Sequence, residues 1–69
     1  SIKEITLNLT SKEQLKEVQN FLEEKGETLV NINYSSSTEK HKFKLKSLRN
    51  IDRKSINILR NKEISLNID

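Results

Sequence analysis

The chain has 69 residues, which is enough for one small domain spanning residues 1–69. Ile, Leu, Val and Phe make up 21 of these residues, above the roughly 20% that marks disordered chains, so the chain should fold. The absence of cysteine excludes a disulfide scaffold, a thiolate metal site and a cysteine nucleophile. No apolar run approaches the roughly 20 residues of a membrane span. We therefore expect a soluble, cytoplasmic domain that contacts no membrane.

Charge is distributed unevenly along the chain. Residues 1–39 hold four lysines and seven glutamates, a net charge of −3, whereas residues 40–69 hold nine Lys or Arg and three acids, a net charge of +6. A basic half in a small domain indicates an acidic protein surface or a nucleic acid as its neighbour. The alternative is a solvated face of a lysine-rich protein that binds neither.

The first third of the sequence predicts a strand followed by a helix. Ile5–Leu9 alternates apolar and polar residues, the period of a strand with one buried face. Residues 10–14 offer two overlapping capping boxes, Thr10 with Glu13 or Ser11 with Gln14. The helix should run to about residue 25, and Gly26 stands where a left-handed helix terminator is expected.

The middle of the chain predicts two strands joined by a polar turn, residues 35–38. The first strand is Thr28–Tyr34, and the second is His41–Ser47, with Phe43 and Leu45 on one face and lysines on the other. Lysines at alternate strand positions also occur where a sheet edge must be protected from pairing, which is a second interpretation of this pattern.

The last third predicts a short helix capped by Asp52, then a strand at Ile64–Ile68. The resulting order, β-α-β-β-α-β, predicts an α+β fold: a ferredoxin-like split sandwich with two helices on one face of a four-stranded sheet. The expected core is Leu7, Leu15, Val18, Leu22, Val30, Ile32, Phe43, Leu45, Ile56, Leu59 and Leu66. The open face would carry Thr6, Asn8, Asn31, Asn33, Lys42, Lys44, Ser65 and Asn67.

The residues give little support for catalysis. His41 is the only histidine, and neither a positioned acid–base partner nor a set of metal ligands accompanies it in the sequence. One glycine cannot build a phosphate-binding loop. The carboxylates of the first helix lie on its polar side, spaced for pairing with lysines. We expect no enzyme activity, no cofactor and no metal.

Binding by the basic half is the stronger hypothesis. The RNA-recognition motif has the same element order, but its strands carry base-stacking aromatic residues that are missing here. Two binding roles stay open, docking on an acidic protein surface and phosphate contact that ignores base sequence. A small regulatory ligand-binding domain of similar fold is a third. The candidate partner-binding residues are Lys42, Lys44, Lys46, Arg49, Arg53 and Lys54.

Several features of the sequence occur together in one known family. They are the hydrophobic pattern of the first strand and helix, an acidic helix end, the two following strands, and the segment Arg49-Asn50-Ile51-Asp52. The residues concerned are Ile5–Leu9, Leu15, Val18, Leu22, Glu24, Gly26, Val30–Ile32, Lys42–Lys46 and Arg49–Asp52. In these features the chain resembles, over nearly its whole length, the C-terminal domain of the bacterial replicative DNA polymerase III alpha subunit, whose last helix has a similar Arg/Tyr-x-Val-Asp-like entry.

This resemblance implies a C-terminal fragment of a much larger chain, whose polymerase reaction, DNA-directed DNA synthesis in replication, belongs to other domains. It implies docking of the clamp-loader tau subunit as the role of the domain. The polymerase's metal-binding aspartates lie elsewhere in that family, so the resemblance transfers no catalytic residue to this sequence.

Overall fold

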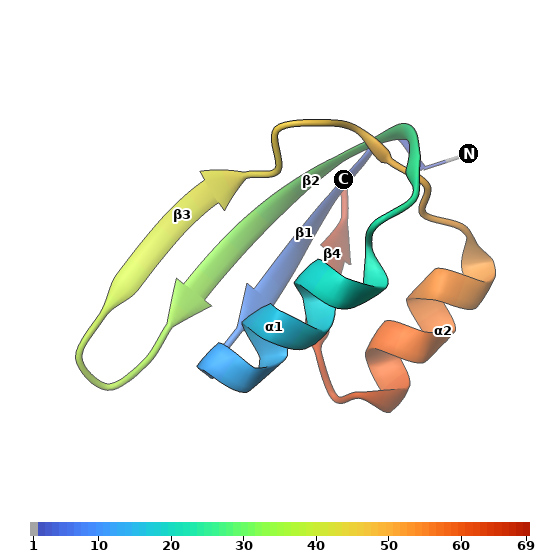
Figure 1. The fold of residues 1–69 in the computed structure, drawn as a ribbon. Coiled ribbons are helices and arrows are strands. Elements are labelled where there is room, and N and C mark those ends of the chain that lie inside the picture. The colour runs from blue at the N-terminus through green and yellow to red at the C-terminus, as the bar shows by residue number, and fades with distance from the viewer. Residues whose placement is uncertain (1) are drawn as a thin grey trace.

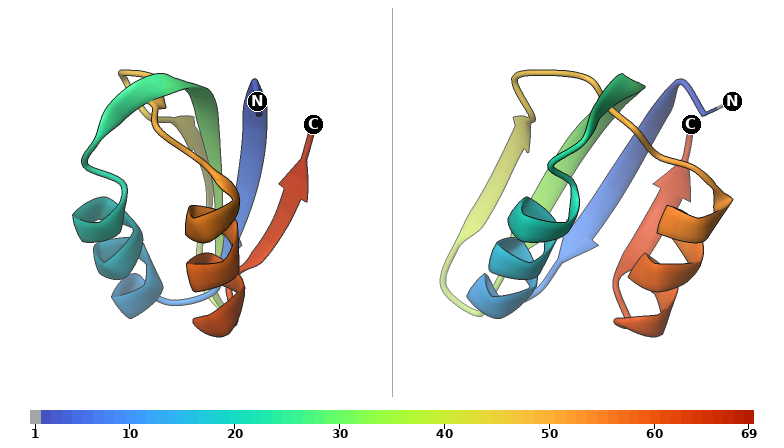
Figure 2. Two further views of the ribbon diagram at one scale, coloured as in Figure 1. Left: turned by 90° about the vertical axis from the view of Figure 1, so that its right-hand side faces the viewer. Right: turned by 45° about the vertical axis from the view of Figure 1, so that its right-hand side comes forward.

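The computed structural model describes residues 2–69, and it confirms the predicted α+β fold and the β-α-β-β-α-β order (Figure 1). Four strands form one mixed sheet, and both helices lie on the same side of it (Figure 2). The elements are β1 (Glu4–Leu9), α1 (Lys12–Phe21), β2 (Lys25–Ser35), β3 (Lys40–Lys44), α2 (Arg53–Asn61) and β4 (Ser65–Ile68).

The strands are arranged in the order β3-β2-β1-β4. β1 pairs in parallel with β2, whereas β3 is antiparallel to β2 and β4 is antiparallel to β1. No strand is inserted between β1 and β2, so the β1-α1-β2 unit is joined directly, and the split strand arrangement expected from the sequence was wrong. β3 is the first strand in this order and lies at an edge of the sheet, which confirms that its lysines occupy an edge strand.

The alternation predicted for the strands sets which residues the helices cover. Ile5, Leu7 and Leu9 of β1 are buried, and so are Val30, Ile32 and Tyr34 of β2. Ile5 lies opposite Val30 and Leu7 opposite Ile32, so these rows form one apolar sheet face. The apolar sheet face is covered by Val18 of α1, by Leu22 directly after α1, and by Ile56 and Leu59 of α2. The loops add Ile51 and Ile64 to this core.

The predicted core is wrong at one position, and three other positions are buried only in part. Phe43 is exposed, because no helix extends over β3 (Figure 1). Leu15, Leu45 and Leu66 are half-buried against the rim of the core. All eight residues predicted for the open face do share one face, as the strand registers place them opposite one another.

The prediction that Gly26 ends the first helix in a left-handed conformation was wrong. α1 ends at Phe21, four residues earlier than expected, and Gly26 belongs to β2 with a φ that is not positive. Because Gly26 has no side chain, another segment of the main chain can approach it closely. A Cβ atom on Gly26 would lie 2.5 Å from Cα of Asn50, so the main chain that leads to α2 crosses directly over this glycine.

The predicted helix starts are largely correct. Ser11 caps α1 by accepting a hydrogen bond from the backbone N–H of Gln14, at 3.1 Å. The Gln14 side chain accepts a hydrogen bond from the backbone N–H of Thr10 rather than from that of Ser11. Asp52 caps α2 in a reciprocal box with Ser55.

Candidate functional site

The outer edge of β3 carries main-chain N–H and C=O groups that are not hydrogen-bonded to any other strand of the described residues. Leu45 donates its N–H to the carbonyl of Val30, and Ser36 donates to the carbonyl of Glu39, so these two pairs mark the hydrogen-bonded positions of the ladder. Such positions recur at every second residue of an antiparallel pair. His41 and Phe43 are therefore bonded to β2, and the N–H and C=O groups of the three lysines between and beside them point outward. These lysines are Lys40, Lys42 and Lys44.

The side chains of β3 alternate between the two faces of the sheet. Lys42 lies opposite Asn33 and Lys44 opposite Asn31, both of which belong to the open face. A shallow hollow of about 330 Å³ lies between these lysines and the two asparagines. Phe43, in contrast, projects to the side on which the helices pack.

A groove of about 700 Å³ runs between α1 and β3 on the helix side of the sheet. Leu15, Tyr34 and Phe43 supply its apolar surface, while Lys12 and Lys16 of α1 line the wall opposite β3. The groove exists because α1 packs over the centre of the sheet and leaves the edge strand uncovered (Figure 2). Lys12 and Lys16 give the groove a positive wall on α1, whereas the side chains of Lys42 and Lys44 belong to the open face on the other side of β3.

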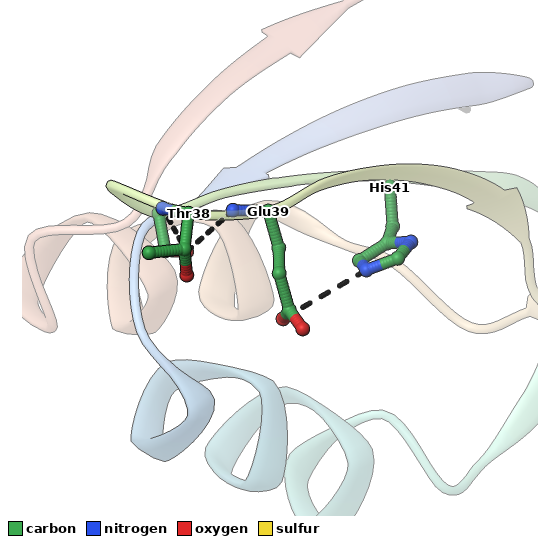
Figure 3. A network of polar contacts seen from close by, with 4 residues as sticks. Thr38, Glu39 and His41 are labelled. Carbon is green, nitrogen blue, oxygen red and sulfur yellow. Dashed lines mark hydrogen bonds and ion pairs between the residues drawn. The ribbon is translucent and has the colours of Figure 1, made fainter.

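Polar contacts at the tip of the β2–β3 hairpin hold the groove's outer wall in place (Figure 3). The hydroxyl of Ser36 accepts hydrogen bonds from the backbone N–H groups of Thr38 and Glu39, at 3.3 and 3.1 Å. The Glu39 carboxylate lies 3.8 Å from the His41 imidazole, and both side chains point toward α1. The His41 ring stacks on Tyr34, with the ring centroids 6.2 Å apart. His41 therefore serves as part of the groove wall.

The open face is bound together by its own side chains. The amide of Asn33 donates to Asn8, and the amide of Asn8 donates to Asn67, at 3.2 and 3.0 Å, so one row of hydrogen bonds crosses β2, β1 and β4. Asn31 donates to the carboxylate of Glu4 at 2.7 Å. The strand registers of the described residues place no aromatic ring on this face. It offers polar contacts but no surface on which bases can stack.

The six residues predicted to bind a partner do not form one patch. Lys42 and Lys44 lie together on β3, and Lys46 is exposed in the loop that follows. Arg53 and Lys54 lie in the first turn of α2, which packs near β4, at the edge of the sheet opposite to β3 (Figure 2). The structure thus separates the basic half of the sequence into two regions.

Arg49 has a structural role. Its guanidinium donates a hydrogen bond to the carbonyl oxygen of Leu22 at the end of α1, and its Nε donates to the carbonyl of Ser47 at 3.2 Å. Its backbone bridges to Lys25 and Thr28. The side chain therefore joins the end of α1 to the chain between β3 and α2.

Sequence reasoning missed the groove. Lys12, Leu15, Lys16 and Tyr34 belong to elements that were predicted correctly, but their position opposite β3 depends on the strand order. The signal that was present is the run of alternate lysines from Lys40 to Lys44, which is typical of an edge strand.

Residues 2–69 contain no cluster of three or more His, Cys, Asp or Glu side chains arranged to hold a metal ion. Neither helix in this part of the chain is long and apolar enough to cross a membrane. No family model, curated protein or solved structure matches the chain.

Proposed function

We propose that this domain is a non-catalytic protein-interaction module that binds an acidic segment of a partner protein at β3 and the adjoining groove. One observation carries the proposal: an uncovered apolar groove lies beside a strand whose lysines occupy alternate positions. Protein interfaces combine an apolar centre with a polar rim, and complementary charge guides the partners into register. An apolar surface surrounded by lysines fits a partner that is acidic and carries apolar side chains.

The position of the aromatic side chains favours a protein over a nucleic acid. Tyr34 and Phe43 line the groove on the helix side, and Tyr34 is buried under the His41 ring. Single-stranded nucleic acids are usually held by base stacking in addition to phosphate contacts. On the open face, Lys42 and Lys44 supply only the phosphate contacts, which weaken steeply as salt rises.

The resemblance to the polymerase III alpha subunit extends this proposal to a parent chain. On that basis the domain would be the C-terminal module of a cytoplasmic replicative polymerase, with the clamp-loader tau subunit as its partner. This extension rests on hydrophobic pattern and spacing alone. Purified tau subunit tests it directly: tau should bind the domain and lose affinity when Lys42 and Lys44 are both changed to Glu.

Fluorescence anisotropy of two labelled probes tests the proposed function itself. One probe is an acidic peptide made of Glu and Val, and the other is a single-stranded oligonucleotide of matched charge. At about 150 mM salt, where the screening length is about 8 Å, the peptide should saturate the domain and the oligonucleotide should bind only weakly. Tight, saturable binding of the oligonucleotide alone would replace the protein-docking role with a nucleic-acid role.

A further inference from the structure

The free edge of β3 indicates how an acidic segment is bound. Lys40, Lys42 and Lys44 direct their main-chain N–H and C=O groups away from the sheet, and all five residues of β3 are exposed. We propose that the partner contributes an extended segment of alternating acidic and apolar residues, which pairs with β3 as a fifth, antiparallel strand. This inference rests on the proposed function, and it adds the conformation and residue pattern of the ligand.

The residue pattern follows from the geometry of an antiparallel pair. Residues directly opposite each other in such a pair project to the same face of the sheet. A residue opposite Lys42 therefore lies on the open face beside a lysine ammonium, with further lysines at the neighbouring positions of the same row. Opposite charges at directly paired positions stabilise a sheet and like charges destabilise it, so acidic residues belong at these positions.

The other half of the pattern lies over the groove. Residues opposite His41 and Phe43 project to the helix side, where Phe43 is exposed beside Leu15 and Tyr34. Apolar side chains at these positions would cover Phe43 and enter the groove from its open side. Val is suited to them because β-branched residues pack well on the pleated surface of a sheet.

The lysines also limit which strands can pair. A second copy of this chain that paired through β3 would place Lys42 against other lysines, which opposes self-association through this edge. An acidic strand removes the same repulsion. The lysine row thus protects the edge against like strands and admits an acidic one.

The main-chain geometry provides a matched pair of probes. In the proposed complex, each Glu of an alternating Glu-Val peptide lies opposite a lysine and exchanges two main-chain hydrogen bonds with it, whereas the Val N–H groups point away from β3. N-methylation of the two central Glu residues removes hydrogen bonds to the domain. N-methylation of the two central Val residues adds the same methyl groups without touching that edge.

The experiment measures the anisotropy of these labelled peptides at about 150 mM salt. The alternating peptide should bind about tenfold more tightly than a shuffled peptide of the same composition, and N-methyl-Glu should weaken it about tenfold more than N-methyl-Val. The variant Lys42→Glu/Lys44→Glu should lose the Glu-Val peptide and gain a Lys-Val peptide, which shows that it is folded. The variant Arg53→Glu/Lys54→Glu makes the same charge change on α2 and should keep the parent's affinity.

Four outcomes would overturn the proposal of a fifth strand. Equal affinities for alternating and shuffled peptides, or equal effects of the two N-methylations, would leave acidic docking intact and exclude strand addition. Absence of binding by every acidic peptide would instead remove the proposed function. A concentration-dependent dimer of the domain alone that the Lys42→Glu/Lys44→Glu change abolishes would show that a second copy occupies the edge.

Discussion

Ile32 and Phe43 lie directly opposite each other in the β2–β3 ladder, yet Ile32 is 1% exposed and Phe43 is 40% exposed. The two side chains share one face of the sheet, so their difference in exposure follows from the strands that carry them. β2 is central, between β1 and β3, whereas β3 is at the edge and beyond both helices (Figure 1). The edge position makes Phe43 a surface residue, and this gives the groove its apolar wall.

A comparison of Leu59 with Phe43 tests this difference in burial. Leu59→Ala should lower the free energy of unfolding by about 2–5 kcal/mol, because Leu59 is fully buried. Phe43→Ala should cost about 1–2 kcal/mol, since much of the ring already contacts water. Urea denaturation followed by circular dichroism measures both values. Equal losses for the two variants would mean that Phe43 belongs to the core.

Gly26→Ala should destabilise the domain although the backbone of Gly26 suits any residue. The added Cβ would lie 2.5 Å from Cα of Asn50, so two main-chain segments must separate, at a cost of about 1–3 kcal/mol. Glu27→Ala, at the exposed neighbouring position of β2, is the control and should change stability by no more than about 0.5 kcal/mol. A Gly26→Ala variant as stable as this control would contradict the close approach.

Arg49→Ala should reduce stability and leave peptide binding unchanged. The substitution removes the hydrogen bonds that the guanidinium donates to the carbonyls of Leu22 and Ser47, and bonds to charged groups contribute about 1.5–3 kcal/mol. Arg60→Ala, an exposed arginine of α2, serves as the control. If Arg49→Ala melts like the parent but loses affinity for an acidic peptide, Arg49 contacts the partner and not the end of α1.

Asp52 should make the stability of α2 depend on pH in the acid range. The hydrogen bonds that its carboxylate accepts from the backbone and side chain of Ser55 hold its pKa below the ordinary value of 3.8. The folded state thus favours the carboxylate, and its stabilising effect is complete above pH 3.8 and lost as the pH falls through the lowered pKa. Asp52→Asn retains a capping oxygen that does not titrate.

The melting temperatures of the parent and Asp52→Asn measure this effect between neutral pH and about pH 2. Any advantage of the parent should persist down to pH 3.8 and shrink below it. A difference that stays constant to the lowest pH would show that the Asp52 cap does not bind the charged form preferentially.

The sequence was sufficient to predict those elements that depend on nearby residues. The alternation at Ile5–Leu9 and the capping residues Ser11 and Asp52 are local signals, and the structure confirms the strand and both caps. Gly26 shows the limit of such signals: a glycine after a helix is typical of a left-handed terminator, but here it accommodates Asn50, which lies far along the chain.

The candidate site could not be predicted for the same reason. Phe43 has the alternation of a core residue, and whether a helix covers it depends on the position of its strand in the sheet. Arg49 follows the lysine strand in sequence, but its hydrogen bond to Leu22 depends on where α1 ends. The alternation of the lysines in β3 was visible from the start, whereas their relation to Lys12 and Lys16 on α1 requires the folded chain.

Amide hydrogen exchange of β3 tests the central claim most directly. In the free domain, the N–H groups of Lys40, Lys42 and Lys44 should exchange quickly, while those of His41 and Phe43 should be protected by β2. Saturation with the alternating Glu-Val peptide should slow exchange at the three lysines selectively. If the peptide binds and the lysine amides still exchange at their free rates, the partner does not add a strand to this edge. If these amides are already protected in the free domain at low concentration, the edge is not available for a partner.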